Sequence, residues 1–195
     1  WSGWFASYRA FQLHFARLAQ QAGVELLILG CEMTQTEHRE QEWRQLIAAI
    51  REVYTGALSY NCDKYGEEYV SWWDALDVIC SSGYYPIDQM EQNLNRIEQT
   101  VNTLQKPFFF AEAGCMRVKG SAYRPNDWSL QGPVDPQEQA AWYQALFAAC
   151  AARPWFGGTA LWDWPLKGQE KTNRYALVGM PAQEVNRTYY SRKAE

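Results

Sequence analysis

The sequence lacks the patterns that mark several large classes of protein. No apolar run approaches the roughly 20 residues of a membrane-spanning helix, although 47% of the 195 residues are hydrophobic. Lys and Arg form no cluster, and the formal net charge is −4. Proteins that bind nucleic acids usually gather basic residues on one face. These absences argue against a membrane partner and against a nucleic-acid partner.

Metal-binding and nucleotide-binding patterns are also missing. The chain has two His, no CxxC pair and no HExxH-type spacing that would join Glu32, His38, Asp63 and Glu112 into a metal site. No GxGxxG follows a predicted strand, and Gly157–Gly158 precedes its strand instead of opening a helix. We therefore expect no metal and no other cofactor.

The cysteines bear on the cellular compartment. They are odd in number and widely spaced, which favours reduced thiols in the cytoplasm: Cys31, Cys62, Cys80, Cys115 and Cys150. The chain begins at Trp1 instead of Met, and we expect that something upstream has been removed or left out. Secretion therefore stays open if the removed segment was a signal peptide.

Aromatic residues are unusually frequent. Ten Trp and twelve Tyr contribute to an aromatic content of 15%, and several of them fall in predicted loops. An indole in a loop offers a flat surface to the apolar face of a sugar ring, whose hydroxyls then reach polar side chains. Packing in a core is the alternative for any single Trp.

Short apolar runs alternate with amphipathic helices along the whole chain, which predicts one α/β domain over residues 1–195 with a parallel sheet. The runs predict strands at residues 24–30, 57–60, 76–80, 108–111 and 157–162. The periodicity predicts helices at residues 7–21, 37–54, 67–75, 88–104, from 135 to about 150, and 181–190. Such a series builds either a doubly wound sheet or part of a (β/α)8 TIM barrel.

The positions of the polar residues favour the barrel. Reactive residues of a TIM barrel come from the carboxyl ends of its strands. The predicted strand ends carry carboxylates, amides, phenols and indoles, a set suited to a sugar: Glu32, Gln35, Asn61, Asp63, Tyr84, Tyr85, Glu112, Trp162, Asp163 and Trp164. The loop that contains Tyr123, Trp128 and Gln131 forms either the wall of a distal subsite or ordinary surface packing.

Glu32 and Glu112 suggest a specific chemistry. They are 80 residues apart, nearly three βα units at roughly 31 residues per unit, which would place them across the mouth of a barrel. A retaining glycosidase needs one carboxylate as nucleophile and one carboxylic acid as proton donor. Glu112 follows four apolar residues, Phe108 to Ala111, where a carboxylate is costly without a role.

The sequence resembles glycoside hydrolase family 113 and its relatives. The similar segments follow one another in the order that the family shows: Gly30–Met33, Trp43–Ile47, Tyr54–Tyr60, Trp73–Asp77, Tyr84–Pro86, Phe110–Gly114, Trp155–Gly158 and Leu161–Trp164. The family belongs to clan A of the retaining glycosidases and acts on β-1,4-linked mannan. Cys31 departs from the pattern, since many clan members have Asn there, and so do Cys115 and Met116.

The resemblance implies roles for individual residues. Glu32 would be the acid/base at the end of the fourth barrel strand, and Glu112 the nucleophile at the end of the seventh. Tyr84 would contact the nucleophile and Trp162 would be a platform for the sugar. The chain would then supply about strands 4 to 8, and the first three strands would be absent. Either the chain is trimmed, or a second chain completes the barrel, or the barrel is degenerate.

Two other functions remain open. The first is a catalytically inactive glycan-binding or scaffold barrel that keeps the aromatic mouth. The second is an unrelated α/β enzyme that uses Cys31 or Cys115 as nucleophile, with His38 as its partner. The sequence does not fix which hexose is bound, endo or exo action, or the oligomeric state.

Overall fold

The computed structural model describes residues 1–169 and 172–192. It divides into two compact units, each of which is described by itself. Unit 1 comprises Trp1–Ser81 and Thr100–Phe109, and unit 2 comprises Ser82–Gln99 and Phe110–Glu195. β3, β4 and α3 each contribute residues to both units.

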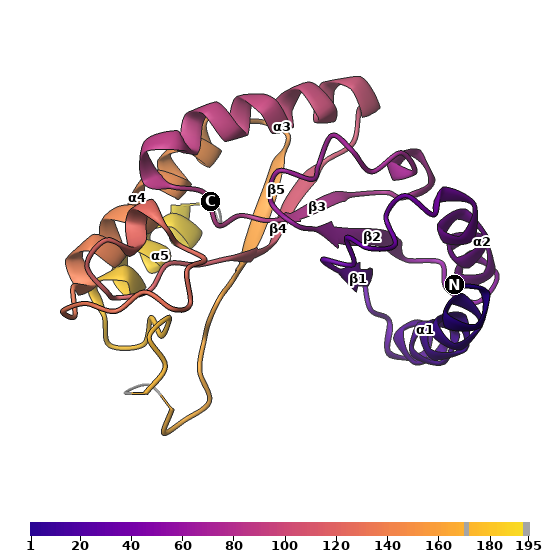
Figure 1. The fold of residues 1–195 in the computed structure, drawn as a ribbon, viewed down its shortest axis with the longest axis horizontal. Coiled ribbons are helices and arrows are strands. Elements are labelled where there is room, and N and C mark those ends of the chain that lie inside the picture. Colours follow the sequence, from indigo (N-terminus) through magenta and orange to yellow (C-terminus); the bar gives the residue numbers. More distant parts are fainter. Residues whose placement is uncertain (170–171, 193–195) are drawn as a thin grey trace. The chain divides into compact units, whose positions relative to one another are not determined.

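The strands form a sheet of five in the order β1-β2-β3-β4-β5 (Figure 1). They are β1 (Leu26–Cys31), β2 (Ala57–Cys62), β3 (Ile79–Ser82), β4 (Phe108–Ala113) and β5 (Phe156–Leu161). β1 pairs with β2, and β2 with β3, in parallel. A doubly wound sheet reverses its strand order at a switch point, whereas barrel strands follow one another in chain order. The order therefore agrees with part of a TIM barrel.

Helices α1 (Ser2–Ala22) and α2 (Glu40–Arg51) of unit 1 pack against each other (Figure 1). The predicted stripe of α2 is buried at Trp43, Leu46, Ile47 and Ile50. The Trp43 ring stacks on that of Trp72 with 4.6 Å between centroids. This aromatic core lies directly behind the loop that follows β1.

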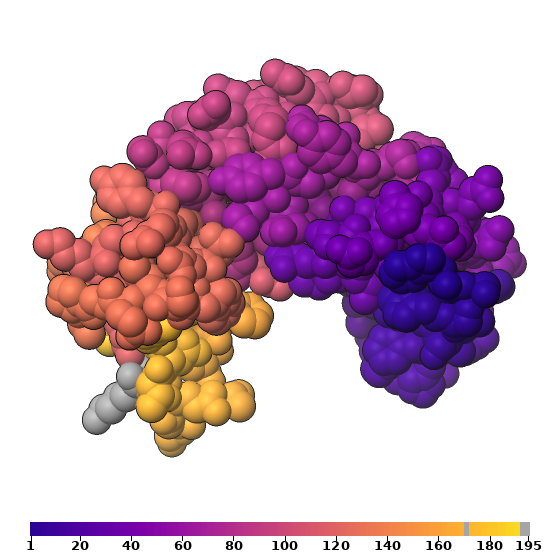
Figure 2. Space-filling view, in the orientation of Figure 1, coloured from indigo at the N-terminus to yellow at the C-terminus, as the bar shows by residue number. Residues whose placement is uncertain are grey.

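The other side of α1 is an apolar face exposed to solvent. Phe11, Phe15 and Leu18, at helical spacing in the sequence, are 54%, 44% and 45% exposed. The rings of Tyr8, Phe11 and Phe15 follow one another along the helix. The opposite side buries Phe5, Gln12, Ala16 and Ala19. Figure 2 shows part of the α1 surface in indigo. Helical periodicity located the helix, but it did not tell which side is buried.

The predicted helix at residues 67–75 is wrong. Only a 3-10 turn, η1 (Trp73–Ala75), forms there. Trp72 and Trp73 are both buried, and their indole N–H groups donate to the backbone oxygens of Glu37 and Glu67. Consecutive residues of an α-helix point about 100° apart, so an irregular backbone buries both rings better.

The strand predicted at residues 76–80 begins three residues later, at Ile79. The reason is Asp77, whose carboxylate accepts a hydrogen bond from the backbone N–H of Leu58. The same carboxylate forms an ion pair with Arg51 at 2.5 Å. A side chain therefore takes a hydrogen bond that a ladder partner would have taken.

In unit 2 the helix α4 (Pro136–Ala151) begins as predicted. Asp135 is its N-cap and accepts the N–H of Glu138, and Pro136 stands at the first position. The Glu138 carboxylate does not reach back to the cap, because it accepts the N–H groups of Gly120 and Ala122 instead. α4 thereby fixes the long loop after β4.

The remaining helices match the predicted ones closely. A 3-10 turn, η2 (Ile87–Gln89), leads into α3 (Met90–Leu104). Another, η3 (Ser121–Tyr123), lies within the long loop, and α5 (Pro181–Arg192) closes the described fold. α5 packs on α4, where the rings of Tyr189 and Phe147 stack at 4.1 Å.

Candidate active site

Glu32 follows the last residue of β1 in unit 1. The register of β1 against β2 shifts between Ile28 and Cys31, and an irregularity of this kind can turn the side chains that follow it. Glu32 then adopts a φ of 50°, the left-handed region that a non-glycine residue seldom occupies. Its N–H donates to the backbone oxygen of Asn61 at 2.8 Å. Glu32 is exposed to solvent.

Asn61 is the second predicted site residue of unit 1. It lies near the end of β2, is buried, and donates from Nδ2 to the Cys31 sulfur at 3.1 Å. Asp63 follows the strand, with its Oδ1 3.7 Å from Nζ of Lys64. Asn61 thus binds the Glu32 N–H through its backbone oxygen and the Cys31 sulfur through its side chain, as expected of neighbouring strand ends.

Sequence reasoning missed Glu37 and Tyr60. The Tyr60 hydroxyl donates to Oε1 of Glu37 at 2.7 Å and accepts the N–H of Met33 at 2.8 Å. Burial raises the pKa of Glu37, an effect that the Tyr60 hydrogen bond opposes and the Asp63 charge reinforces. The one signal in the sequence for Tyr60 was the alternation of side chains along β2, which places Tyr60 and Cys62 on the same face of the strand.

Glu112 lies within the last two residues of β4, in unit 2, and has Tyr84 as a partner. The Tyr84 hydroxyl donates to Oε2 of Glu112 at 3.0 Å, a contact that the resemblance to the family implied. Burial, and then the Glu112 carboxylate, raise the pKa of Tyr84 well above its ordinary value. Tyr84 therefore stays a hydrogen-bond donor at neutral pH.

Tyr85 has a different environment from Tyr84. Its side chain is fully buried, its ring lies 6.1 Å from that of Phe110, and its hydroxyl accepts from Arg96 at 3.4 Å. Its backbone oxygen accepts the indole N–H of Trp142. Tyr85 thus anchors the segment that carries Tyr84 to the core of unit 2.

Exposed aromatic rings lie after β5 and in the loop after β4. Trp128 and Trp162 are 56% and 36% exposed, and their rings meet edge to face at 6.0 Å. The Trp128 ring also lies 4.8 Å from that of Tyr175. Arg174 fixes the loop by donating to the backbone oxygens of Trp128 and Leu130. Two of the predicted aromatic residues, Trp128 and Trp162, are therefore in contact, and we call this pair the aromatic corner.

Asp163 and Trp164 follow Trp162. Both carboxylate oxygens of Asp163 accept from Nδ2 of Asn173, at 2.8 and 2.9 Å. Trp164 is 58% exposed. Behind the aromatic corner, Gly114 lies so close to the Trp162 carbonyl oxygen that a Cβ atom at position 114 would overlap it. The ends of β4 and β5 are thereby in direct contact.

Comparisons with known proteins identify the family of the chain. The family model of Glycoside Hydrolase Family 113 matches residues 1–179. The chain belongs to glycoside hydrolase family 113. No curated protein matches the chain.

Two solved structures of this family are similar to the chain. One is a GH113 β-1,4-mannanase, with 47% identity and a TM-score of 0.93 over 98% of this chain and 63% of its own. Another, the β-mannanase of Alicyclobacillus acidocaldarius, has 40% identity and a TM-score of 0.91, with the same coverage of 98% and 63%. The family-113 chain thus spans less than two thirds of the length of either enzyme.

A more distant likeness concerns the fold alone. The β-glucuronidase of Faecalibacterium prausnitzii has a TM-score of 0.72 at 18% identity, over 96% of this chain and 35% of its own.

The family-113 chain does not support the alternative of a cysteine nucleophile. Burial raises the pKa of Cys115 to about 12, and a thiol is a nucleophile only as its thiolate. Cys31 is exposed and accepts a hydrogen bond from the Asn61 side chain. All five cysteines lie among the described residues, and none forms a disulfide.

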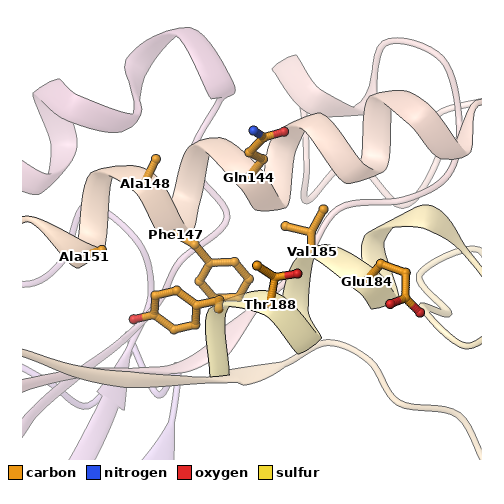
Figure 3. Close-up of a pocket in the computed structure, with 8 residues that line it drawn as sticks. Gln144, Phe147, Ala148, Ala151, Glu184, Val185 and Thr188 are labelled. Atoms are coloured by element: carbon orange, nitrogen blue, oxygen red, sulfur yellow. The ribbon is translucent and has the colours of Figure 1, made fainter. Parts of the chain in front are cut away.

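A groove between α4 and α5 lies apart from these residues. The groove is open and presents Gln144 and Phe147 of one helix to Val185 and Thr188 of the other (Figure 3). It contains none of the predicted site residues. Over residues 1–169 and 172–192, no His, Cys, Asp and Glu side chains gather as a metal site would require, and no helix is long and apolar enough to span a bilayer.

Proposed function

We propose that this chain is the catalytic part of a retaining β-1,4-mannanase that works by double displacement. Glu112 attacks the anomeric carbon while Glu32 protonates the departing glycosidic oxygen. Glu32 then takes a proton from water as that water cleaves the glycosyl ester on Glu112. The bond between Tyr84 and Glu112 is the observation that carries the proposal, because it orients one carboxylate oxygen at the end of a strand.

The other site residues would bind the substrate. Trp162 and Trp128 offer adjoining aromatic surfaces for pyranose rings, and Trp164 offers another. Asn61 and Asp163 would hydrogen-bond to sugar hydroxyls, and Tyr85 would act by supporting Tyr84. In this proposal residues 1–195 form one domain, about strands 4 to 8 of the barrel, completed by a preceding segment or a second chain.

Trapping of the covalent intermediate tests the proposal. A 2-fluoro mannosyl fluoride should label the protein, and mass spectrometry of its peptides should place the label on Glu112. Glu112→Gln and Glu32→Gln should each lower the hydrolysis of mannan oligosaccharides by several orders of magnitude. Glu184→Gln is the matched control, because Glu184 is exposed and pairs with Arg187 on the surface of α5.

Three results would contradict the proposal. They are label on another residue, full activity of Glu112→Gln, and release of the inverted anomer. Oligosaccharide binding without any turnover, in a protein that includes the complete barrel, would instead identify a non-catalytic glycan-binding protein.

A further inference from the structure

The backbone at Glu32 has an unfavourable conformation that its surroundings must maintain. A φ of 50° at a residue with a side chain costs conformational energy. Such a conformation persists only where neighbouring contacts hold it. On one side of the residue, the Glu32 N–H is bound by the backbone oxygen of Asn61. The next N–H along the chain, that of Met33, is bound by the Tyr60 side chain.

The direction of this hydrogen-bond chain is fixed. The Met33 N–H can only donate, so the Tyr60 oxygen accepts it and its own proton must point elsewhere. The proton points to Oε1 of Glu37, at 2.7 Å, and an ionised carboxylate can only accept. Burial, together with the bound Glu37, raises the pKa of Tyr60 well above its ordinary value. Tyr60 therefore remains a phenol throughout the working range of an enzyme.

Both members of the pair are held in place. Tyr60 is fully buried, with its ring 5.2 Å from that of Trp43. Its ring edge and the Met33 sulfur both approach Gly30 so closely that a Cβ atom there would lie 3.2 and 3.1 Å from them. The backbone oxygen of Glu37 accepts the Trp72 indole N–H at 3.0 Å. The loop from Glu32 to Glu37 is thus attached at both ends to buried aromatic residues.

We propose that Tyr60 and Glu37 are positioning residues for the general acid. By holding the Met33 amide, they keep the Glu32 peptide left-handed and so aim the Glu32 carboxyl group at the leaving oxygen. This inference goes beyond the two glutamates of the proposed function and rests on the role that it gives to Glu32. Neither residue is proposed to touch the substrate.

The leaving group of the substrate provides the test. Tyr60→Phe removes only the hydroxyl and should lower kcat/KM on mannan oligosaccharides about tenfold, the effect of one charge-linked hydrogen bond. An aryl mannoside with a dinitrophenolate leaving group needs no proton donor. Its kcat/KM should change less than about twofold. Glu37→Gln keeps an acceptor for Tyr60 and should fall between Tyr60→Phe and the parent protein.

Tyr54→Phe is the matched control. Tyr54 is equally buried in unit 1, and its hydroxyl donates to the backbone oxygen of Val24 at 2.8 Å, away from Glu32. Its loss should affect both substrates alike. Equal losses on the two substrates in Tyr60→Phe, or the same substrate preference in Tyr54→Phe, would overturn the inference.

A second measurement does not depend on activity. The Met33 amide should exchange with solvent faster in Tyr60→Phe than in the parent protein, and at an unchanged rate in Tyr54→Phe. Unchanged exchange in Tyr60→Phe would refute the positioning role. If a protein that includes the complete barrel is inactive on both substrates, the proposed function is refuted, and the amide exchange still decides whether Tyr60 holds the Glu32 peptide.

Discussion

Tyr84 and the residue before it, Gly83, both donate hydrogen bonds to Glu112. The Tyr84 hydroxyl lies 3.0 Å from Oε2 of Glu112, and the N–H of Gly83 donates to the Glu112 backbone oxygen at 2.6 Å. The same segment after β3 therefore fixes both the main chain and the carboxylate of Glu112. Glu112, as the nucleophile that we propose, therefore needs little reorganisation before it attacks.

Tyr84→Phe should lower kcat/KM about tenfold to hundredfold, because a hydrogen bond to a charged group is worth roughly 1.5–3 kcal/mol. The loss should be similar for mannan oligosaccharides and for activated aryl mannosides, since both require the nucleophile. Steady-state kinetics on the two substrates measure it. Tyr190→Phe, which removes a hydroxyl bound to the Thr159 backbone oxygen, should have little effect. A loss confined to the oligosaccharides would contradict the role of Tyr84.

Trp128→Ala should weaken the binding of mannan oligosaccharides about fivefold, corresponding to roughly 1 kcal/mol of lost apolar contact. The kcat should change little, because Trp128 is proposed to contact a sugar ring and not the reacting bond. Titration calorimetry with the Glu112→Gln variant separates binding from turnover. Trp1→Ala removes an indole of similar exposure, 51% against 56%, and should leave the affinity unchanged. Equal affinities for Trp128→Ala and its parent would remove Trp128 from the site.

Trp43→Ala should reduce the free energy of unfolding by about 3–5 kcal/mol, the usual cost of truncating a buried large aromatic residue. The Trp43 side chain is fully buried, stacks on Trp72 and donates its indole N–H to the Thr36 backbone oxygen. Urea unfolding followed by circular dichroism measures the change, with Trp1→Ala as an exposed control. A loss below about 1 kcal/mol would show that the core of unit 1 packs differently.

The reactivity of the thiols should be uneven. Burial raises the pKa of Cys80 and of Cys115 to about 12, so at pH 8 only about one such thiol in ten thousand is ionised. Iodoacetamide should therefore modify the exposed Cys31 first, and Cys31→Ser should remove this fast phase. Because a higher pH produces more thiolate, the slow phase should accelerate with rising pH. Rapid labelling of Cys115 in the folded protein at pH 8 would contradict this assignment.

Much of the fold was predictable because its signals are local. The stripe from Trp43 to Ile50, the run from Phe108 and the Asp135 cap each act within a few residues, and each produced the expected element. The contact between Tyr84 and Glu112 was implied by the resemblance to the family, and the hydrogen bond between them is present.

What the sequence did not predict depends on contacts between distant residues. Residues 67–75 have helical composition, but the burial of both Trp72 and Trp73 outweighs that preference. The register shift in β1 and the left-handed Glu32 follow from the pairing with β2. Glu37 and Tyr60 are 23 residues apart, and no spacing rule connects a loop carboxylate to the side chain of the next strand.

Gly114 lies so close to the Trp162 carbonyl oxygen that a single methyl group at position 114 would push the two segments apart. Gly114→Ala would leave the chemical groups of Glu112 and Trp162 intact while forcing the ends of β4 and β5 apart. Such a variant would show how much the alignment of Glu112 and Trp162 matters. Substitution of Glu112 or of Trp162 cannot show this, because it also removes the side chain.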